Sequence, residues 1–126
     1  KFLHFEKGRF KKFVFRKTTK KIYNELKDLT LLRKKGIIEY PKKGLKFLET
    51  ITKKIKKFKG GILLIDYGYT KAIGKDTLQS LKSHKKNLYY KNIGKSDITS
   101  LVNFELLNKF LTKKKLLIKI VKQNII

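Results

Sequence analysis

Asp66 occupies the position in this sequence where a carboxylate has the clearest chemical use. It follows an apolar run at residues 62–65 that does not alternate with polar residues. Such a run is typical of a strand buried on both faces of a parallel sheet. In open α/β sheets, ligands bind just beyond the carboxyl ends of these strands. Asp66 is therefore either a residue of a functional site or a cap for the loop that begins there.

Other candidates for chemistry follow Asp66 along the chain. His84 could orient a substrate or accept a proton, although a histidine that braces its own loop through hydrogen bonds fits the sequence equally well. Tyr67 could line a substrate slot or simply pack, and Gly68 suits a turn with positive φ. The remaining candidates have short side chains that either contact a substrate or bond nearby backbone N–H groups in turns. They are Thr77, Asp97 and Thr99.

A helix and a tight turn are expected to bring Asp66 into position. Pro41 suits the first turn of a helix, and the pair Gly60 and Gly61 suits its end. Between them, apolar residues recur at spacings of three and four, which predicts one buried stripe. The stripe consists of Leu45, Leu48, Ile51, Ile55 and Phe58. A helix followed by a buried strand is half of a parallel crossover, so the other strands of the sheet must come largely from elsewhere.

The N-terminal third predicts a β-hairpin and a connection. Residues 10–15 and 21–23 are rich in strand-forming side chains and flank the polar residues 17–20. This pattern predicts a hairpin at the edge of a sheet, with lysines that guard against pairing with other edges. Residues 24–35 are polar and charged apart from a leucine patch, and we expect them to form the least ordered connection of the chain.

The C-terminal part predicts a capped helix and a last strand. Asn103 can cap a helix that begins with Phe104, and Glu105 would lie in its positively polarised first turn. Residues 116–121 predict a strand, whereas residues 76–83 fit either a short helical turn or an extended segment.

Composition narrows the class of protein. The formal net charge is +25, but only three of the 34 basic residues are arginines, the residue that specific readers of nucleic acid favour. We interpret most of the charge as lysine on solvated faces, which gives weak, salt-sensitive attraction to polyanions. A small basic nucleic-acid-binding or ribosome-associated protein remains the alternative.

With no cysteine and only two histidines, no metal site is expected. No apolar run approaches the roughly 18 residues of a membrane span.

The order of several short blocks resembles one family. The blocks "GGILLIDYGY", "DTLQSLKSH", "SDITSLVNFELL" and "VKQNII" follow one another as the corresponding blocks do in MidA-type S-adenosylmethionine-dependent methyltransferases. The eukaryotic members of that family are mitochondrial complex I assembly factors. Residues 38–41, "IEYP", are similar to the Glu-x-x-Pro segment that precedes the same helix in the family. The opening block "KFLHFEKGRFKKFVF" resembles the strand region after the family's Asn-Glu-Phe-x-Asp segment.

The resemblance implies a fold and a cofactor. The fold would be a partial Rossmann-like class I methyltransferase sandwich, an α/β domain with a mostly parallel sheet and an N-terminal β-hairpin insertion. Residues 1–126 would form a single partial domain that holds the later strands and the substrate-side loops. The cofactor, S-adenosyl-L-methionine, would be bound by residues upstream of Lys1 in the complete protein, and the fragment alone would be inactive.

The resemblance also implies roles for the candidate residues. Asp66 and His84 would be catalytic, and Asp66 would hold a guanidinium group by paired hydrogen bonds. The substrate-binding residues would be Tyr67, Gly68, Thr77, Asp97 and Thr99. The acceptor would be a protein arginine, on a respiratory complex I subunit or a similar partner. The protein would act in the cytoplasm of a bacterium or in the mitochondrial matrix of a eukaryote.

Overall fold

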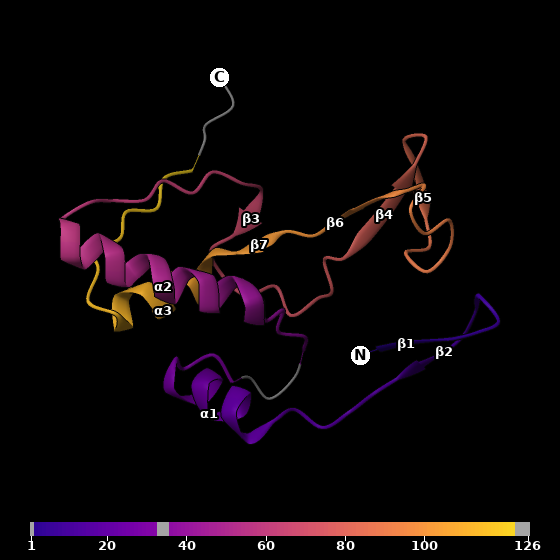
Figure 1. Cartoon of the computed structure of the whole chain (residues 1–126), viewed down its shortest axis with the longest axis horizontal. Helices are drawn as coiled ribbons and strands as arrows, with labels where there is room; N and C mark the ends of the chain where they lie inside the picture. Colours follow the sequence, from indigo (N-terminus) through magenta and orange to yellow (C-terminus); the bar gives the residue numbers. More distant parts are fainter. Residues whose placement is uncertain (1, 33–35, 123–126) are drawn as a thin grey trace.

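The computed structural model describes residues 2–32 and 36–122 of the chain. Its helices, α1 (Lys20–Asp28), α2 (Lys42–Phe58) and α3 (Phe104–Lys113), gather in one part of the molecule. Two β-hairpins extend away from them, and a short strand pair lies between the helices and one of these hairpins (Figure 1).

The strands form three small sheets within the described ranges. β3 (Gly68–Tyr69) and β7 (Val102–Asn103) pair in parallel. β4 (Gln79–Lys82) pairs antiparallel with both β5 (Lys85–Asn87) and β6 (Asp97–Thr99). The mixed α/β composition agrees with the predicted class. The Rossmann-like sandwich, however, is not visible in the described residues, because most of their pairing is antiparallel and no large parallel sheet forms.

The N-terminal hairpin consists of β1 (Phe2–Glu6) and β2 (Arg9–Val14). Lys7 and Gly8 make the turn between them, both with positive φ. The predicted hairpin therefore exists, but its strands were wrongly placed, because the partner of β2 precedes it in the chain and does not follow it.

Aromatic rings attach this hairpin to the loop after β5. The rings of Phe10 and Tyr90 are stacked with their centroids 4.0 Å apart, and Phe13 contacts both Tyr89 and Tyr90. Stacked and edge-on ring pairs of this kind stabilise a contact beyond the apolar area that they bury. The hairpin and the β4–β6 sheet are thus held together through aromatic side chains.

Residues 21–23, which predicted a strand, belong to α1. The hydroxyl of Thr19 caps this helix by accepting a hydrogen bond from the N–H of Ile22 at 3.4 Å. Ile22, Leu26 and Leu29 then follow at spacings of four and three, so they share one helical face that packs on the core. A window of three residues is too short to show that repeat, which is why the sequence prediction failed here.

The expected connection over residues 24–35 is also wrong where the structure describes it. Residues 24–28 are helical, and Leu26, Leu29 and Leu31 are buried. The leucine patch is therefore part of the core. Residues 33–35 lie outside the described part of the chain.

Helix α2 confirms the first half of the predicted stripe. It follows Pro41, which occupies the N-cap position, and Leu45 and Leu48 are buried. Its last stripe residue, Phe58, is exposed. The helix ends at Phe58, and its C-cap residue Lys59, which directly precedes the expected glycine pair, adopts the left-handed conformation.

The central strand predicted at residues 62–65 is absent from the structure. This segment has no regular hydrogen-bonded partner, and all four of its side chains are exposed. The apolar pattern was real, but a strand needs a neighbour along its edge, and no described strand lies there. The strand predicted at residues 116–121 fails in the same way, although Leu116 and Ile118 do pack against the core.

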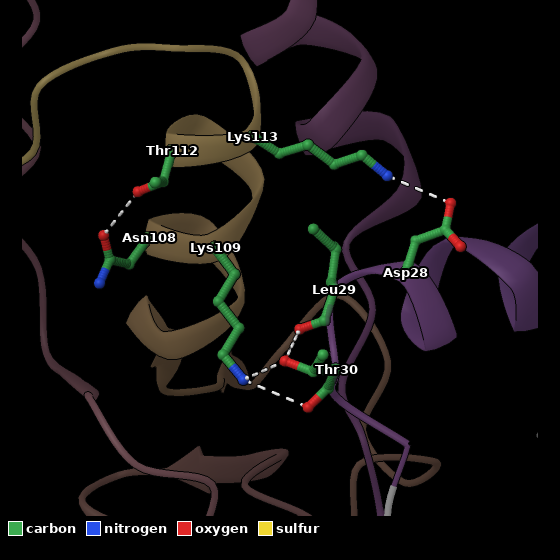
Figure 2. Close-up of a pocket in the computed structure, with 7 residues that line it drawn as sticks. All are labelled: Asp28, Leu29, Thr30, Asn108, Lys109, Thr112 and Lys113. Atoms are coloured by element: carbon green, nitrogen blue, oxygen red, sulfur yellow. Dashed lines mark hydrogen bonds and ion pairs between the residues drawn. The ribbon is translucent and has the colours of Figure 1, made fainter.

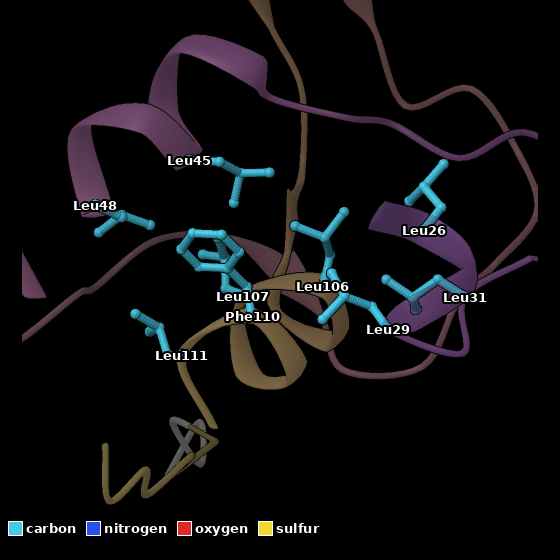
Figure 3. Packing of buried hydrophobic residues seen from close by; sticks show 9 residues of the cluster. All are labelled: Leu26, Leu29, Leu31, Leu45, Leu48, Leu106, Leu107, Phe110 and Leu111. Carbon is cyan, nitrogen blue, oxygen red and sulfur yellow. The ribbon is translucent and has the colours of Figure 1, made fainter. Parts of the chain in front are cut away.

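The hydrophobic core joins the three helices (Figure 3). Helix α3 carries its centre, Leu106, which is fully buried. Asn103 caps this helix by accepting a hydrogen bond from the N–H of Leu106 at 3.0 Å, and Glu105 lies in the first turn, as predicted. The buried apolar set is Leu26, Leu29, Leu31, Leu45, Leu48, Leu106, Leu107, Phe110 and Leu111.

Candidate functional site

Asp66 lies at the entry to the parallel pair of β3 and β7. Its Oδ1 accepts a hydrogen bond from the N–H of Tyr67 at 2.7 Å, and its Oδ2 takes none from the described residues. The carbonyl of Tyr67 accepts the N–H of Val102 at 2.9 Å, which anchors this point to β7. The side chains of Asp66 and Tyr67 are both exposed. The carboxylate is thus bonded to the backbone N–H of Tyr67 and open to solvent.

Gly68 has a different function in the fold from the one predicted. Its backbone is extended as part of β3, so the expected turn with positive φ is wrong. A Cβ atom at this position would overlap the carbonyl oxygen of Val102 and come within 2.6 Å of the Phe104 ring. Glycine is therefore needed for the close approach of β3 to β7 and to the start of α3.

Thr77 joins a network centred on the carboxylate of Glu39. The N–H and the hydroxyl of Thr77 donate to Oε1 of Glu39 at 2.9 Å and 2.7 Å. Tyr69 donates to Oε2 of Glu39 at 3.2 Å. The hydroxyl oxygen of Thr77 also accepts the N–H of Leu101 at 3.0 Å. These bonds join four parts of the chain. They are the segment before α2, strand β3, the loop before β4 and the loop before β7.

The environment of this network changes the titration of Tyr69. Burial raises the pKa of Tyr69 to about 12, and the charge and hydrogen bond of Glu39 and the charge of Glu105 add to the shift. Glu105 itself accepts the N–H of Ala72 at 2.6 Å and pairs with Lys109 at 3.4 Å. Burial, together with the two carboxylates, thus favours the protonated Tyr69 phenol, which donates a hydrogen bond to Glu39.

This shift predicts a pH-dependent contribution to stability. The phenol of Tyr69 has a pKa of about 12 when folded and an ordinary value of 10.0, so the folded state holds the proton more tightly. Its stabilising contribution is full below pH 10 and is lost as the pH rises towards 12. In urea unfolding, the stability difference between the native protein and Tyr69→Phe should shrink over this range. Lysine titration cancels in the comparison, because both proteins contain the same lysines.

Tyr23→Phe, at an exposed tyrosine of α1, is the control for this experiment. Any change with pH that Tyr23→Phe shares with Tyr69→Phe reflects the loss of a tyrosine in general and is subtracted from the Tyr69→Phe result. A Tyr69→Phe difference that stays constant up to pH 12 would contradict the raised pKa of Tyr69 in the folded protein.

The structure does not bring His84 to Asp66. Ser83 and His84 form the two-residue turn between β4 and β5, both with positive φ, and His84 is exposed. Figure 1 shows this hairpin extending away from β3. Asp97 and Thr99 lie in β6 and not in the expected turn, and both are exposed. Of the predicted site residues, Asp66, Tyr67 and Gly68 are contiguous, and Thr77 reaches β3 through Glu39.

An open groove lies elsewhere, between the end of α1 and α3 (Figure 2). Its polar groups bind one another. Lys109 donates to the carbonyl and hydroxyl oxygens of Thr30 at 3.2 Å each, and Lys113 pairs with Asp28 at 3.1 Å. We interpret this groove as a helix contact, since its lysines already have partners.

Comparison with known families identifies the chain. Asp66 precedes β3, so it lies at the amino end of the parallel pair and not, as the sequence had led us to expect, at the carboxyl end of a strand. The fold alone therefore does not define an activity. A family model described as "putative S-adenosyl-L-methionine-dependent methyltransferase" matches residues 2–120. The chain belongs to this family of S-adenosylmethionine-dependent methyltransferases. Neither a curated protein nor a solved structure matched the chain.

The described residues do not fit the cofactor of the family. In Rossmann-like folds a nucleotide cofactor lies against a glycine-rich turn between a strand and the following helix. The described helices begin after Thr19, Pro41 and Asn103, and no glycine with positive φ directly precedes one of them. In the same ranges, no cluster of three or more His, Asp or Glu residues could hold a metal ion, and no helix is long and apolar enough to cross a membrane.

Proposed function

We propose that this chain forms the acceptor side of a MidA-type methyltransferase that modifies arginine in a protein. The observation that carries the proposal is the carboxylate of Asp66, which is exposed beside a parallel strand pair and held in place by the N–H of Tyr67. The family match supports methyl transfer in general. The arginine acceptor, a complex I subunit as partner, and the bacterial cytoplasm or mitochondrial matrix as location are extensions of that match.

The chemistry of Asp66 suits a guanidinium group. Arginine stays protonated under all ordinary conditions, so a carboxylate can hold it by charge and by two parallel hydrogen bonds. Oδ2 takes no hydrogen bond from the described residues, and Oδ1 keeps a second lone pair beside the Tyr67 N–H bond. Asp66 would therefore orient the acceptor nitrogen, and most of its effect would come from positioning.

The cofactor would be held by a second part of the enzyme. Under this proposal the cofactor-binding half would lie outside residues 1–126, and the described residues hold no glycine turn of the kind that cradles a nucleotide. Within this proposal the 126 residues form one partial domain, with Tyr67 and Thr77 near the acceptor. His84 is too remote in the fold to share a group with Asp66, and any role it has in catalysis would need a different contact.

Acceptor binding can be tested on the chain itself. We expect an arginine-containing peptide to shift the backbone NMR signals of Asp66 and Tyr67 in the 126-residue protein. The same peptide with citrulline, which has nearly the same shape but no charge, should leave them unchanged. Asp66→Asn should abolish the arginine response. Equal shifts with both peptides, or a response unchanged in Asp66→Asn, would exclude recognition of the guanidinium by Asp66.

A further inference from the structure

The parallel pair that follows Asp66 is short for a stable sheet. β3 and β7 contribute two residues each, Gly68 opposite Val102 and Tyr69 opposite Asn103. No third described strand joins this pair, which lies between the helices and the β4–β6 sheet (Figure 1). A two-stranded hairpin is already marginally stable by itself, so a pair of this length needs support from side chains.

Glu39 supplies that support to both strands. Its Oε2 accepts the hydroxyl of Tyr69, which belongs to β3. Both of its oxygens also accept the hydroxyl of Thr77, at 2.7 Å and 2.8 Å. The same hydroxyl oxygen accepts the N–H of Leu101, the residue directly before β7. One carboxylate thus connects β3 and β7 through side chains, in addition to their backbone pairing.

Asp66 lies at the end of this connection. The residue after Leu101 is Val102, and its N–H donates to the carbonyl of Tyr67. The N–H of Tyr67 in turn donates to the carboxylate of Asp66. A binding group has to be held within roughly half an ångström of its productive place by the residues that surround it. The place of the Asp66 carboxylate therefore depends on the alignment of β3 with β7.

The hydroxyl of Thr77 is committed to this connection. A hydroxyl has one proton to donate, and Thr77 shares it between the two oxygens of Glu39. Hydrogen bonds to a carboxylate are stronger than those to a neutral acceptor. Thr77 therefore serves the site through Glu39 and Leu101, with no proton left to give to a substrate.

We propose that Glu39 is a positioning residue, which holds β3 and β7 in alignment and thereby sets the place of Asp66. Tyr69 is its connection to β3, and Thr77 is its connection to β7. The role of this alignment in acceptor binding rests on the proposed function of Asp66, whereas the alignment itself can be measured without an acceptor. Glu39 acts through Asp66 and needs no contact with the acceptor.

Hydrogen exchange in the free 126-residue chain tests the alignment. Thr77→Val keeps the shape of the side chain but loses the hydroxyl, so the Val102 amide should exchange about fivefold faster or more. Thr77→Ser keeps the hydroxyl and should restore nearly the native rate. Thr52→Val is the matched control, because Thr52 is a buried threonine of α2 whose hydroxyl donates to the carbonyl of Glu49. It should leave the Val102 rate unchanged relative to the amides of α3, a comparison in which changes of global stability cancel.

A double variant distinguishes one connection from two separate contacts. Tyr69→Phe removes the bond from β3 to Glu39, and Thr77→Val removes the link from Glu39 to β7. If Glu39 connects the strands, either loss breaks the connection. The Val102 amide of the double variant should then exchange little faster than in either single variant. Independent contacts would give effects that multiply.

The arginine-containing peptide relates the alignment to the acceptor. Thr77→Val should need about fivefold more of this peptide for the same response of the Asp66 signal, and Thr77→Ser should recover it. Equal responses to the arginine and citrulline peptides in the native chain would refute the proposed function, and exchange at Val102 would then decide the alignment alone. A native Val102 rate in Thr77→Val, multiplying effects in the double variant, or an unchanged arginine response despite faster exchange would overturn the positioning role of Glu39.

Discussion

Asp66→Asn should lower turnover by roughly a hundredfold or more in the proposed methyltransferase. Asparagine can still accept the N–H of Tyr67, so the local backbone should keep its structure. What the variant loses is the charge and the second acceptor oxygen that would hold a guanidinium. The measurement is methyl transfer to a purified arginine-containing acceptor, with cofactor affinity determined in parallel.

Asp66→Ala separates this role from capping. If Asp66 only caps its loop, the alanine variant should lose stability on the order of 1 kcal/mol or less, while Asp66→Asn should keep near-normal turnover. Asp28→Asn provides a matched loss of charge, since Asp28 pairs with Lys113 on the helices away from β3. It should leave turnover unchanged. Normal turnover in Asp66→Asn would refute the acceptor-binding role and leave a loop cap.

The parts of the fold that the sequence predicted are those determined by local interactions. The first half of the α2 stripe and the Asn103 cap of α3 depend on residues within one or two turns of each other, and both are confirmed. The prediction for the residues of α1 was wrong because the sequence window was too short. The repeat of this helix needs Leu26 and Leu29, which lie beyond the short strand-like window at residues 21–23. Local pattern therefore predicts a helix well only when the window covers the whole repeat.

The parts that could not be predicted depend on distant neighbours. Whether residues 62–65 form a strand is decided by what lies along their edge, and their own apolar pattern carries no information about that. The Glu39 network joins residues that are 30 to 38 positions apart, through Tyr69 and Thr77. The sequence marked Glu39 only through the similarity of residues 38–41 to a family motif. Nothing local showed that its carboxylate would hold Thr77, one of the predicted site residues.

The largest expected effect on stability is that of Gly68→Ala. An added Cβ would overlap the Val102 carbonyl and lie within 2.6 Å of two ring carbons of Phe104. The ring can move, but the carbonyl belongs to β7 and can move only if the strands separate. We therefore expect a loss of about 2 kcal/mol or more in the free energy of unfolding, measured by urea denaturation.

Two comparison variants test the cause of that loss. Gly61→Ala changes a glycine with nothing within 4 Å of its added Cβ, so it should be neutral or slightly stabilising. Adding Phe104→Leu to Gly68→Ala should relieve the ring contact and recover only part of the loss, because the overlap with the backbone remains. Separation of β3 from β7 should also break the bond from the Val102 N–H to the Tyr67 carbonyl, seen as faster exchange of the Val102 amide. Full recovery in the double variant, or unchanged exchange at Val102, would show that Gly68 is required for ring packing alone and not for the parallel pair that positions Asp66.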